Sequence, residues 1–507
     1  MIKEKIIRNT MSCGAASAVT ILVNFLLMPF MISRLGVTEY GLIGMSAIFT
    51  VGGCVSLLEM GFQSSISKYV AEYNSRDNQT KIAKIICTSA AMFFLIGVIL
   101  TICGILLSTL FVNHLLAIPP QYRLSFRIAL LVVFVSYIFQ FPNFVAMGFL
   151  SGIQRFDILK GAQIVATLFY AGGVVFLLCF GHRYLSLIVF QTCVLFLQFS
   201  FYVWVIWRHH KFLRLRRSNL SLKAMREVFR MTKFLFMSRL SGLAFHNSPR
   251  IIIGIFLGPV FMTSYEAVIK ISRMIKAALG FVNSAIMPAA SELYANENAT
   301  ILRSLFLKAY RYQVIAVFPV VTAVMFLAGQ FYTVWLGSDF VKLAPLLWIA
   351  LIFNLVTPLI TVGGAMMIGM NRKLKSITLL SILNTLLSIL FMLVLIHQYE
   401  LVAVFLGLSA STVIVLPFYV RIFLKEFNVE GWTFFRENVL VVVLAAFPLA
   451  LVSIISQLMV YDNYLTLFFE GGLWCSAYWI VLYFFVLDSE DRDIVKGLTR
   501  NLCYFRK

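Results

Sequence analysis

Charged residues are scarce in this chain. Lys, Arg, Asp and Glu make up 12% of its 507 residues, only 21 residues are acidic, and 61% are hydrophobic. Soluble proteins carry about 25% charged residues. The composition therefore excludes an ordinary soluble protein. Apolar runs of about 20 residues recur from end to end, and they predict an all-α protein that crosses a membrane many times.

The sequence also lacks the motifs of several enzyme classes. It has no Walker A loop, no GxSxG or HExxH motif, and no CxxC pair among its eight scattered cysteines. We therefore expect no ATP hydrolysis by this chain, no metal site, no cofactor and no enzymatic activity. The first apolar stretch has no small-residue cleavage site, so we expect it to remain as a signal anchor.

Hydropathy predicts about fourteen transmembrane helices, and their ends are uncertain by roughly 2–4 residues. The predicted spans are 11–33, 42–66, 86–111, 127–151, 161–181, 184–207, 234–257, 262–287, 306–329, 343–369, 376–396, 401–420, 438–460 and 467–487.

The basic residues lie mostly in short loops on one side of these spans. The opposite side holds five of the 42 Lys and Arg residues: Arg34, Arg123, Arg127, Arg183 and Lys342. By the positive-inside rule, both termini are expected to be cytoplasmic. The net charge of +21 is distributed in the same loops, which favours contact with membrane lipids and argues against nucleic acid.

The sequence contains signs of an internal repeat. Short matches recur in the same order at offsets of 215 to 222 residues, and they coincide with the span pattern. The matched pairs are Leu35-Gly36 with Leu257-Gly258, Asn78 with Asn298, Gly152-Ile153-Gln154-Arg155 with Gly369-Met370-Asn371-Arg372, and His182 with His397. Six helices per repeat would give both halves the same orientation, as in transporters that bind their substrate between two halves.

The repeat predicts four regions: an N-terminal six-helix lobe (1–210), a basic cytoplasmic linker (211–233), a C-terminal six-helix lobe (234–425), and a region with helices 13 and 14 and a cytoplasmic tail (426–507). The linker is expected to fix the topology and to contact anionic lipid headgroups. The last two helices lie outside the repeat, and the sequence leaves their role open between a partner surface, a lipid groove and a structural role.

Ionisable residues inside the predicted spans are the strongest functional signal. Each charge at mid-bilayer costs about 2.5–3.5 kcal/mol on insertion scales. They cluster in the seventh and eighth spans: Arg239, His246, Arg250, Glu266, Lys270, Arg273 and Lys276. At about 100° per residue, the first three share one face of their helix, and Glu266, Lys270 and Arg273 share one face of the next.

The cluster predicts a wet, net-positive cavity that binds an anion. Arginine suits bidentate contact with phosphate oxygens, and lysine acts as a point charge. Simpler interpretations stay open for some members. Arg239 is close enough to a helix end to snorkel, His246 fits a core histidine, and Glu266 can neutralise Lys270 four residues later. Arg250, Arg273 and Lys276 have no such local explanation.

Glu59 is a further acid within a predicted span. It fits either a counter-ion for a neighbouring cation or a carboxylate that couples transport to protons or sodium.

The residues leave three kinds of function open besides transport of an anion. A drug or cation antiporter would need a carboxylate-rich cavity, against which the cationic cluster argues. A membrane-embedded glycosyltransferase or ligase would need catalytic carboxylates, and the short outer loops carry few. A scaffold for polysaccharide enzymes would use the last two helices.

Several short motifs resemble those of Wzx-type O-antigen or oligosaccharide flippases, in the polysaccharide transporter family of the MOP superfamily that also holds the MATE exporters. The motifs are Ser33-Arg34-Leu35-Gly36, Glu39-Tyr40-Gly41, Leu58-Glu59-Met60-Gly61-Phe62, Trp335-Leu336-Gly337 and the Gly-x-Gln/Asn-Arg ends at 152–155 and 369–372.

This resemblance implies two MATE-like six-helix lobes around a central cationic cavity in a bacterial inner membrane. It implies transfer of an undecaprenyl-pyrophosphate-linked oligosaccharide, such as an O-antigen unit for lipopolysaccharide, from the cytoplasmic to the periplasmic leaflet. Polymerase or glycosyltransferase machinery are the partners it suggests. The related peptidoglycan-precursor flippases have fourteen helices, the number predicted here.

Overall fold

The computed structural model describes residues 2–50, 53, 59, 61–210, 212–213, 219–436 and six residues between 471 and 479. Helices make up the elements found there, with no strand among the described residues. They are α1 (Ile2–Ser46), η1 (Ala47–Phe49), α3 (Phe62–Ser75), α4 (Gln79–Leu110), η2 (Phe111–Leu115), η3 (Pro120–Tyr122), α5 (Arg123–Gly152), α6 (Phe156–Cys179), α7 (Tyr184–His209), α8 (Leu222–Phe256), α9 (Pro259–Ala295), α10 (Ala299–Phe326), α11 (Ala328–Leu336), η5 (Ser338–Leu343), α12 (Ala344–Gly369), α13 (Leu374–Glu426) and α14 (Gly431–Phe435).

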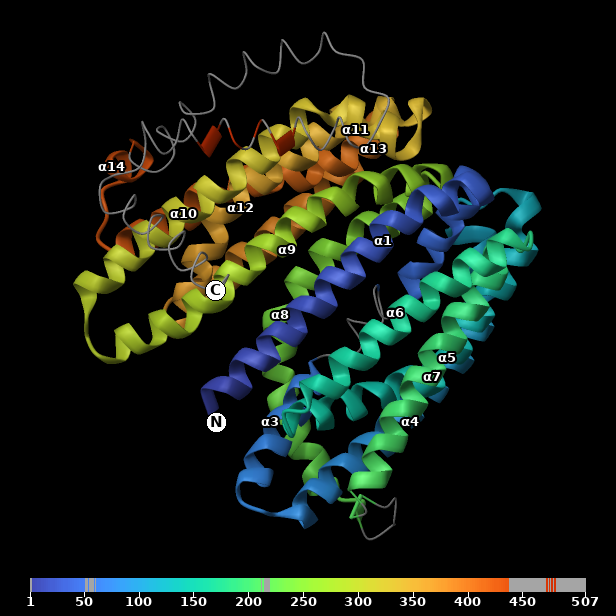
Figure 1. Ribbon diagram of the computed structural model, residues 1–507, viewed down its shortest axis with the longest axis horizontal. Coiled ribbons are helices and arrows are strands. Elements are labelled where there is room, and N and C mark those ends of the chain that lie inside the picture. The colour runs from blue at the N-terminus through green and yellow to red at the C-terminus, as the bar shows by residue number, and fades with distance from the viewer. Residues whose placement is uncertain are drawn as a thin grey trace, which may run out of the picture. The chain divides into compact units, whose positions relative to one another are not determined.

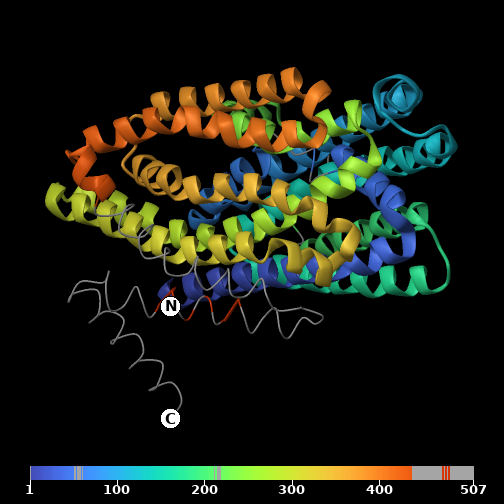
Figure 2. The same ribbon diagram turned by 90° about the horizontal axis from the view of Figure 1, so that it is seen from above.

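The predicted all-α membrane fold is confirmed. Eight helices in the described part of the chain are long and apolar enough to cross a membrane. The predicted spans 376–396 and 401–420 both lie in α13, where Glu400 (φ 46°, ψ −122°) interrupts the helix. The arms before and after Glu400 run side by side, and the Tyr419 hydroxyl donates to the Ile377 carbonyl across them (Figure 2). The span 438–460 and most of 467–487 lie outside the described residues, so fourteen spans stays a prediction.

The predicted single helix over 42–66 is wrong at its centre. α1 ends at Ser46, inside the predicted span, and the short η1 follows it. Gly53 and Glu59 lie in turns, and a new helix, α3, begins at Phe62. Gly61 precedes α3 with φ +78°, a left-handed conformation that glycine adopts without strain. Hydropathy did not detect the break because the intervening residues remain apolar.

Two further differences concern helix boundaries. α8 begins at Leu222, so the second half of the predicted basic linker is helical. The short α11 and η5, between α10 and α12, were not predicted as elements. Trp335 at the end of α11 is 3% exposed, which indicates that this segment packs into the protein.

The chain forms two compact units. Unit 1 comprises Met1–Glu266 and Ile389–Val404, and unit 2 comprises Ala267–Ser388 and Phe405–Lys507. The boundary falls within α9, so the chain passes from one unit to the other inside a helix. The predicted lobe limits at 210 and 234 stay a prediction.

In unit 1, α5 is the central helix. It packs against α3, α4 and α7, while α1 packs against α6 (Figure 1). The Thr101 hydroxyl of α4 donates to the Phe134 carbonyl of α5 at 2.7 Å, and Gly97 lets the backbones of these two helices approach near Tyr137. The small and hydroxyl residues at this interface are those that membrane helices use for close packing.

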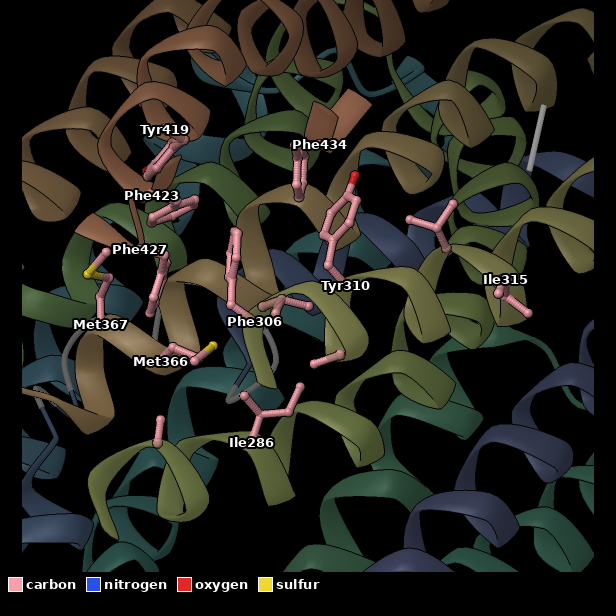
Figure 3. Close-up of a cluster of buried hydrophobic side chains, with 14 of the residues drawn as sticks. Ile286, Phe306, Tyr310, Ile315, Met366, Met367, Tyr419, Phe423, Phe427 and Phe434 are labelled. Atoms are coloured by element: carbon pink, nitrogen blue, oxygen red, sulfur yellow. The ribbon is translucent and has the colours of Figure 1, made fainter. Parts of the chain in front are cut away.

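Unit 2 is held together by an aromatic core. The Phe306 ring of α10 stacks on Phe427, with centroids 4.4 Å apart, and Phe434 of α14 lies 4.7 Å from Tyr310. Figure 3 shows these rings together with Met366 and Met367 of α12. Trp474, which is 3% exposed, belongs to the same cluster. The described part of the C-terminal region therefore contributes to the core of unit 2.

The predicted repeat recurs in the backbone of its turns. Gly36 and Gly258 both have positive φ, at 79° and 84°. Gln154 and Asn371 adopt φ 58° and 54° in the two Gly-x-Gln/Asn-Arg turns. These local conformations match at the same offsets as the sequence and agree with the predicted repeat, which itself stays a prediction.

Asn78 and Asn298 provide a third example. Both precede a helix, with φ −95° and −90°, and the backbone N–H of each donates to the carbonyl five residues earlier. The residue before each asparagine, Asp77 or Glu297, has φ near 50°. A turn of this shape needs a left-handed residue, which is uncommon outside glycine and asparagine.

We expect Gly41→Ala to destabilise unit 1 by about 1–3 kcal/mol, because a Cβ at this position would overlap the Pro259 carbonyl at the start of α9. The thermal melting point of the purified protein measures the effect. Gly172→Ala is the matched control, since a Cβ there meets nothing within 4 Å. Equal melting points for the two variants would contradict the proposed close contact.

Candidate functional site

The candidate site is built on α8 and α9, the two helices that carry the predicted stripe. They are joined by a tight turn in which the N–H groups of Leu257 and Gly258 both donate to the Ile253 carbonyl at 2.9 Å. Gly258 has φ +84°, and a Cβ there would lie 2.6 Å from the Ala117 carbonyl oxygen. Pro259 then occupies the first turn of α9, where its missing N–H costs nothing.

Across this turn, Arg250 and Glu266 form a buried ion pair. The Arg250 Nε donates to Glu266 Oε1 at 2.7 Å, and the two side chains are 11% and 9% exposed. The sequence had offered no partner for Arg250. The pair lies sixteen residues apart, and only the geometry of the turn brings its members together. Glu266 thus neutralises Arg250, a buried cation of the predicted cluster.

The first two turns of α9 also pack closely on residues 37–46 of α1. The Thr263 hydroxyl donates to the Val37 carbonyl at 2.6 Å. Gly41 lies against Pro259, and a Cβ at Gly44 would lie 2.8 Å from Met262 Cγ. Two glycines on one face of α1 therefore admit α9 at short distance, beside the ion pair.

The other cations of α9 lie beyond Glu266, within unit 2. Lys270 is half-buried and Arg273 is exposed. The Lys276 Nζ lies 3.5 Å from the centroid of the Phe353 ring, a cation–π contact with α12. The ammonium group is thus held by an aromatic face.

A buried amide fixes α9 to α12 next to this contact. The Ser272 hydroxyl donates to Asn354 Oδ1, and Asn354 Nδ2 donates to the Ser272 carbonyl, both at 3.2 Å. Asn354 is fully buried. These bonds position the face of α9 that carries Lys276.

The α8 members of the cluster are less completely defined. Arg239 lies within the helix, and its side chain is outside the described part of the structure. His246 is exposed, and its ring centroid lies 5.6 Å from that of Phe245. The structure therefore places both residues on the predicted helix, and their part in binding stays a prediction.

Glu59 caps a helix. Its Oε1 accepts the Gln63 N–H at 2.8 Å, and its carbonyl accepts the Phe62 N–H at 2.9 Å. A carboxylate at a helix N-terminus is stabilised by the unpaired N–H groups there. This hydrogen bond gives Glu59 a local structural role. That role was not predicted from the sequence, because hydropathy indicated an unbroken helix through Glu59. Its predicted role in ion coupling or as a counter-ion remains untested.

Sequence reasoning missed a second ion pair in unit 1. Glu39 is 3% exposed, and its Oε1 accepts from Arg183 Nη1 at 2.6 Å. Its Oε2 also accepts the Tyr184 N–H at 3.5 Å. The bond to Glu39 raises the pKa of Arg183 above its ordinary value. Glu39 follows the positive-φ Gly36, and that proximity to a predicted turn was the available signal.

Among the described residues, no group of three or more His, Cys, Asp and Glu side chains could hold a metal ion. The described side chains place cations with different partners on two successive helices, Arg250 on α8 and Lys276 on α9.

Comparison with known proteins identifies the kind of fold. A family model described as "Polysaccharide biosynthesis protein" matches residues 6–294. A curated relative, the "Uncharacterized membrane protein EpsK" of Bacillus subtilis strain 168, is 23% identical over 329 residues, and the alignment spans 63% of this chain and 63% of that protein.

Several solved structures that resemble this chain are described as transporters or a flippase. "Lipid II flippase MurJ, inward closed conformation" has a TM-score of 0.72 at 13% identity, and covers 94% of this chain and 99% of its own. An inward-facing multidrug resistance MATE transporter of the MOP superfamily has a TM-score of 0.66 at 14% identity, with coverage of 82% and 94%. These likenesses establish a MATE-like fold in a multi-pass membrane protein.

A third solved structure is a MOP superfamily transporter from Pyrococcus furiosus, whose binding pocket is described as having reverse polarity that suggests a different function. It has a TM-score of 0.58 at 17% identity, and covers 84% of this chain and 96% of its own. The solved structures named here are described as transporters or a flippase, and their likeness to this chain concerns the fold.

We expect Asn354→Leu to destabilise unit 2 by about 1–3 kcal/mol, because it removes both bonds to Ser272 and leaves buried polar groups unpaired. The melting point of the purified protein is the measurement. Thr357→Val serves as the control, since the Thr357 hydroxyl bonds to the Phe353 carbonyl of its own helix. Equal losses in the two variants would show that the amide does not fix α9 to α12.

Proposed function

The chain belongs to the family of polysaccharide biosynthesis proteins, and we propose on this basis that it is a flippase for a lipid-linked anionic oligosaccharide. The cargo we propose is an undecaprenyl-pyrophosphate-linked repeat unit, of O-antigen type. The protein moves the headgroup from the cytoplasmic to the periplasmic leaflet of a bacterial inner membrane, with both termini in the cytoplasm.

One observation carries this proposal: two cations of α9, Arg273 and Lys276, are placed where an anion could become their partner. Lys276 rests on the Phe353 ring, and Arg273 is exposed. A cation–π contact contributes about 0.5–2 kcal/mol, so a phosphate oxygen can replace the ring as the partner of the ammonium. A pyrophosphate offers the oxygens that arginine binds in bidentate fashion.

The proposed mechanism uses these cations for the headgroup alone. The sugar–pyrophosphate moiety enters beside α9 from the cytoplasmic side and is bound by Lys270, Arg273 and Lys276, with Arg239 and His246 of α8 as further contacts. The polyprenyl chain stays in the lipid. A change between inward- and outward-open states then releases the headgroup on the other side.

The similarity to a lipid II flippase supports a lipid-linked cargo. The main alternative is a MATE-type antiporter for drugs or organic cations, which has the same fold. Its cargo would need uncompensated acids on α8 or α9. Within the predicted spans 234–257 and 262–287 of these helices, the sequence has one acid, Glu266, and Arg250 neutralises it. The polarity of the stripe therefore favours an anion, and polymerase or glycosyltransferase machinery would be the partners that use the product.

The test is transfer of an undecaprenyl-pyrophosphate-linked oligosaccharide between leaflets of vesicles that contain the purified protein. We expect Arg273→Glu and Lys276→Glu each to lower the transfer rate by about tenfold or more, because each places a negative charge beside the phosphates.

Arg303→Glu is the matched control, because Arg303 is an exposed cation of the same unit in the first turns of α10. It should transfer at the wild-type rate. Wild-type transfer by both α9 variants, at wild-type melting points, would refute the proposed anion site.

A further inference from the structure

We infer that the ion pair of Arg250 and Glu266 positions α9. It fixes the rotation of the helix about its axis and its position along that axis, so that the cations of α9 face the headgroup. Arg250 then acts through Glu266, and the anion is bound further along the helix. The inference rests on the proposed function for the identity of the anion. Three independent features of the structure support it.

The first feature is the partner of each cation. The Arg250 guanidinium is held at 2.7 Å by a carboxylate that is itself 9% exposed. A phosphate at Arg250 would compete with this carboxylate, and displacing it would leave a buried acid without its charge partner, which is strongly unfavourable. Lys276 differs, because its ammonium group contacts the uncharged ring of Phe353. The two cations are therefore unequal as anion ligands.

The second feature is the density of contacts around the pair. Within the eight residues Pro259–Glu266, α9 also bonds to the Val37 carbonyl through Thr263 and packs on Gly41 and Gly44 of α1. These eight residues belong to unit 1, whereas the rest of α9 belongs to unit 2. The ion pair thus lies in the part of the helix that is anchored in unit 1.

The third feature is the spacing along α9. Lys270 and Arg273 follow Glu266 by four and seven residues, so all three lie within about 60° on one face of the helix. At about 1.5 Å per residue, they lie about 6 and 10 Å further along the axis. Because a helix is stiff over this length, the contact that fixes Glu266 also fixes the direction of the two cations.

The experiment compares Arg250→Gln, Glu266→Gln, the double variant Arg250→Met/Glu266→Met and the charge swap Arg250→Glu/Glu266→Arg. Each is measured for the maximal transfer rate and for the half-saturating concentration of the lipid-linked oligosaccharide. We expect the single variants to lower the maximal rate by about tenfold or more while the half-saturating concentration stays within about twofold. The charge swap should recover most of the rate.

The double methionine variant keeps the test valid if the single variants do not fold, since replacing a buried pair by apolar residues is often neutral for stability. It should also bind with an unchanged half-saturating concentration. A rise of about tenfold in that concentration in the double variant would overturn the inference, because it would make Arg250 a direct ligand. Failure of the charge swap at a wild-type melting point would overturn it as well.

A second readout separates this inference from the proposed function. A cysteine at position 273, in a background without the native cysteines, reports the exposure of that face through its rate of reaction with a water-soluble thiol reagent. We expect Glu266→Gln to change this rate and the charge swap to restore it, with no cargo present. If the rates behave in this way but the wild-type protein transfers no lipid-linked oligosaccharide, the proposed function fails and the positioning pair stands. Unchanged rates in all variants would refute the positioning pair.

Discussion

A charge within the apolar part of a membrane protein needs a counter-charge, a polarisable partner or water, and α8 and α9 depend on this constraint. Arg250 has a carboxylate, Lys276 has an aromatic ring, and Arg273 is exposed. These three environments differ in how readily an incoming anion can replace the present partner of the cation. The charge of Arg250 on α8 is therefore fixed by its partner, whereas those of Lys276 and Arg273 on α9 can be taken over by an anion.

The geometry of α8 and α9 depends on small residues. Gly258 permits the tight turn between them, and Gly41 admits the start of α9 next to α1. In a membrane, where lipid competes with side chains for apolar contact, such close backbone approaches and buried hydrogen bonds hold helices together. The two hydrogen bonds between Ser272 and Asn354 serve this purpose in unit 2.

Much of the fold could be predicted from hydropathy and repeat matches, because both depend on local sequence. The helices, the turns at Gly36 and Gly258, and the location of the cations on two successive helices followed from periodicity. The pairing of Arg250 with Glu266 did not, since it depends on which residues face each other across a turn. Glu59 was placed inside a helix because hydropathy cannot detect a break in an apolar run, and Glu39 was undervalued because its partner is 144 residues away.

The order of the chain through the two units has a consequence for biosynthesis. Unit 1 includes Ile389–Val404, and the core of unit 2 includes Trp474 and Tyr478. Neither unit is complete until most of the polypeptide has left the ribosome, although helices enter the bilayer one after another. The early helices therefore lie in the membrane before their packing partners have been synthesised. At this stage their unfilled packing surfaces expose them to misassembly and to quality-control proteases.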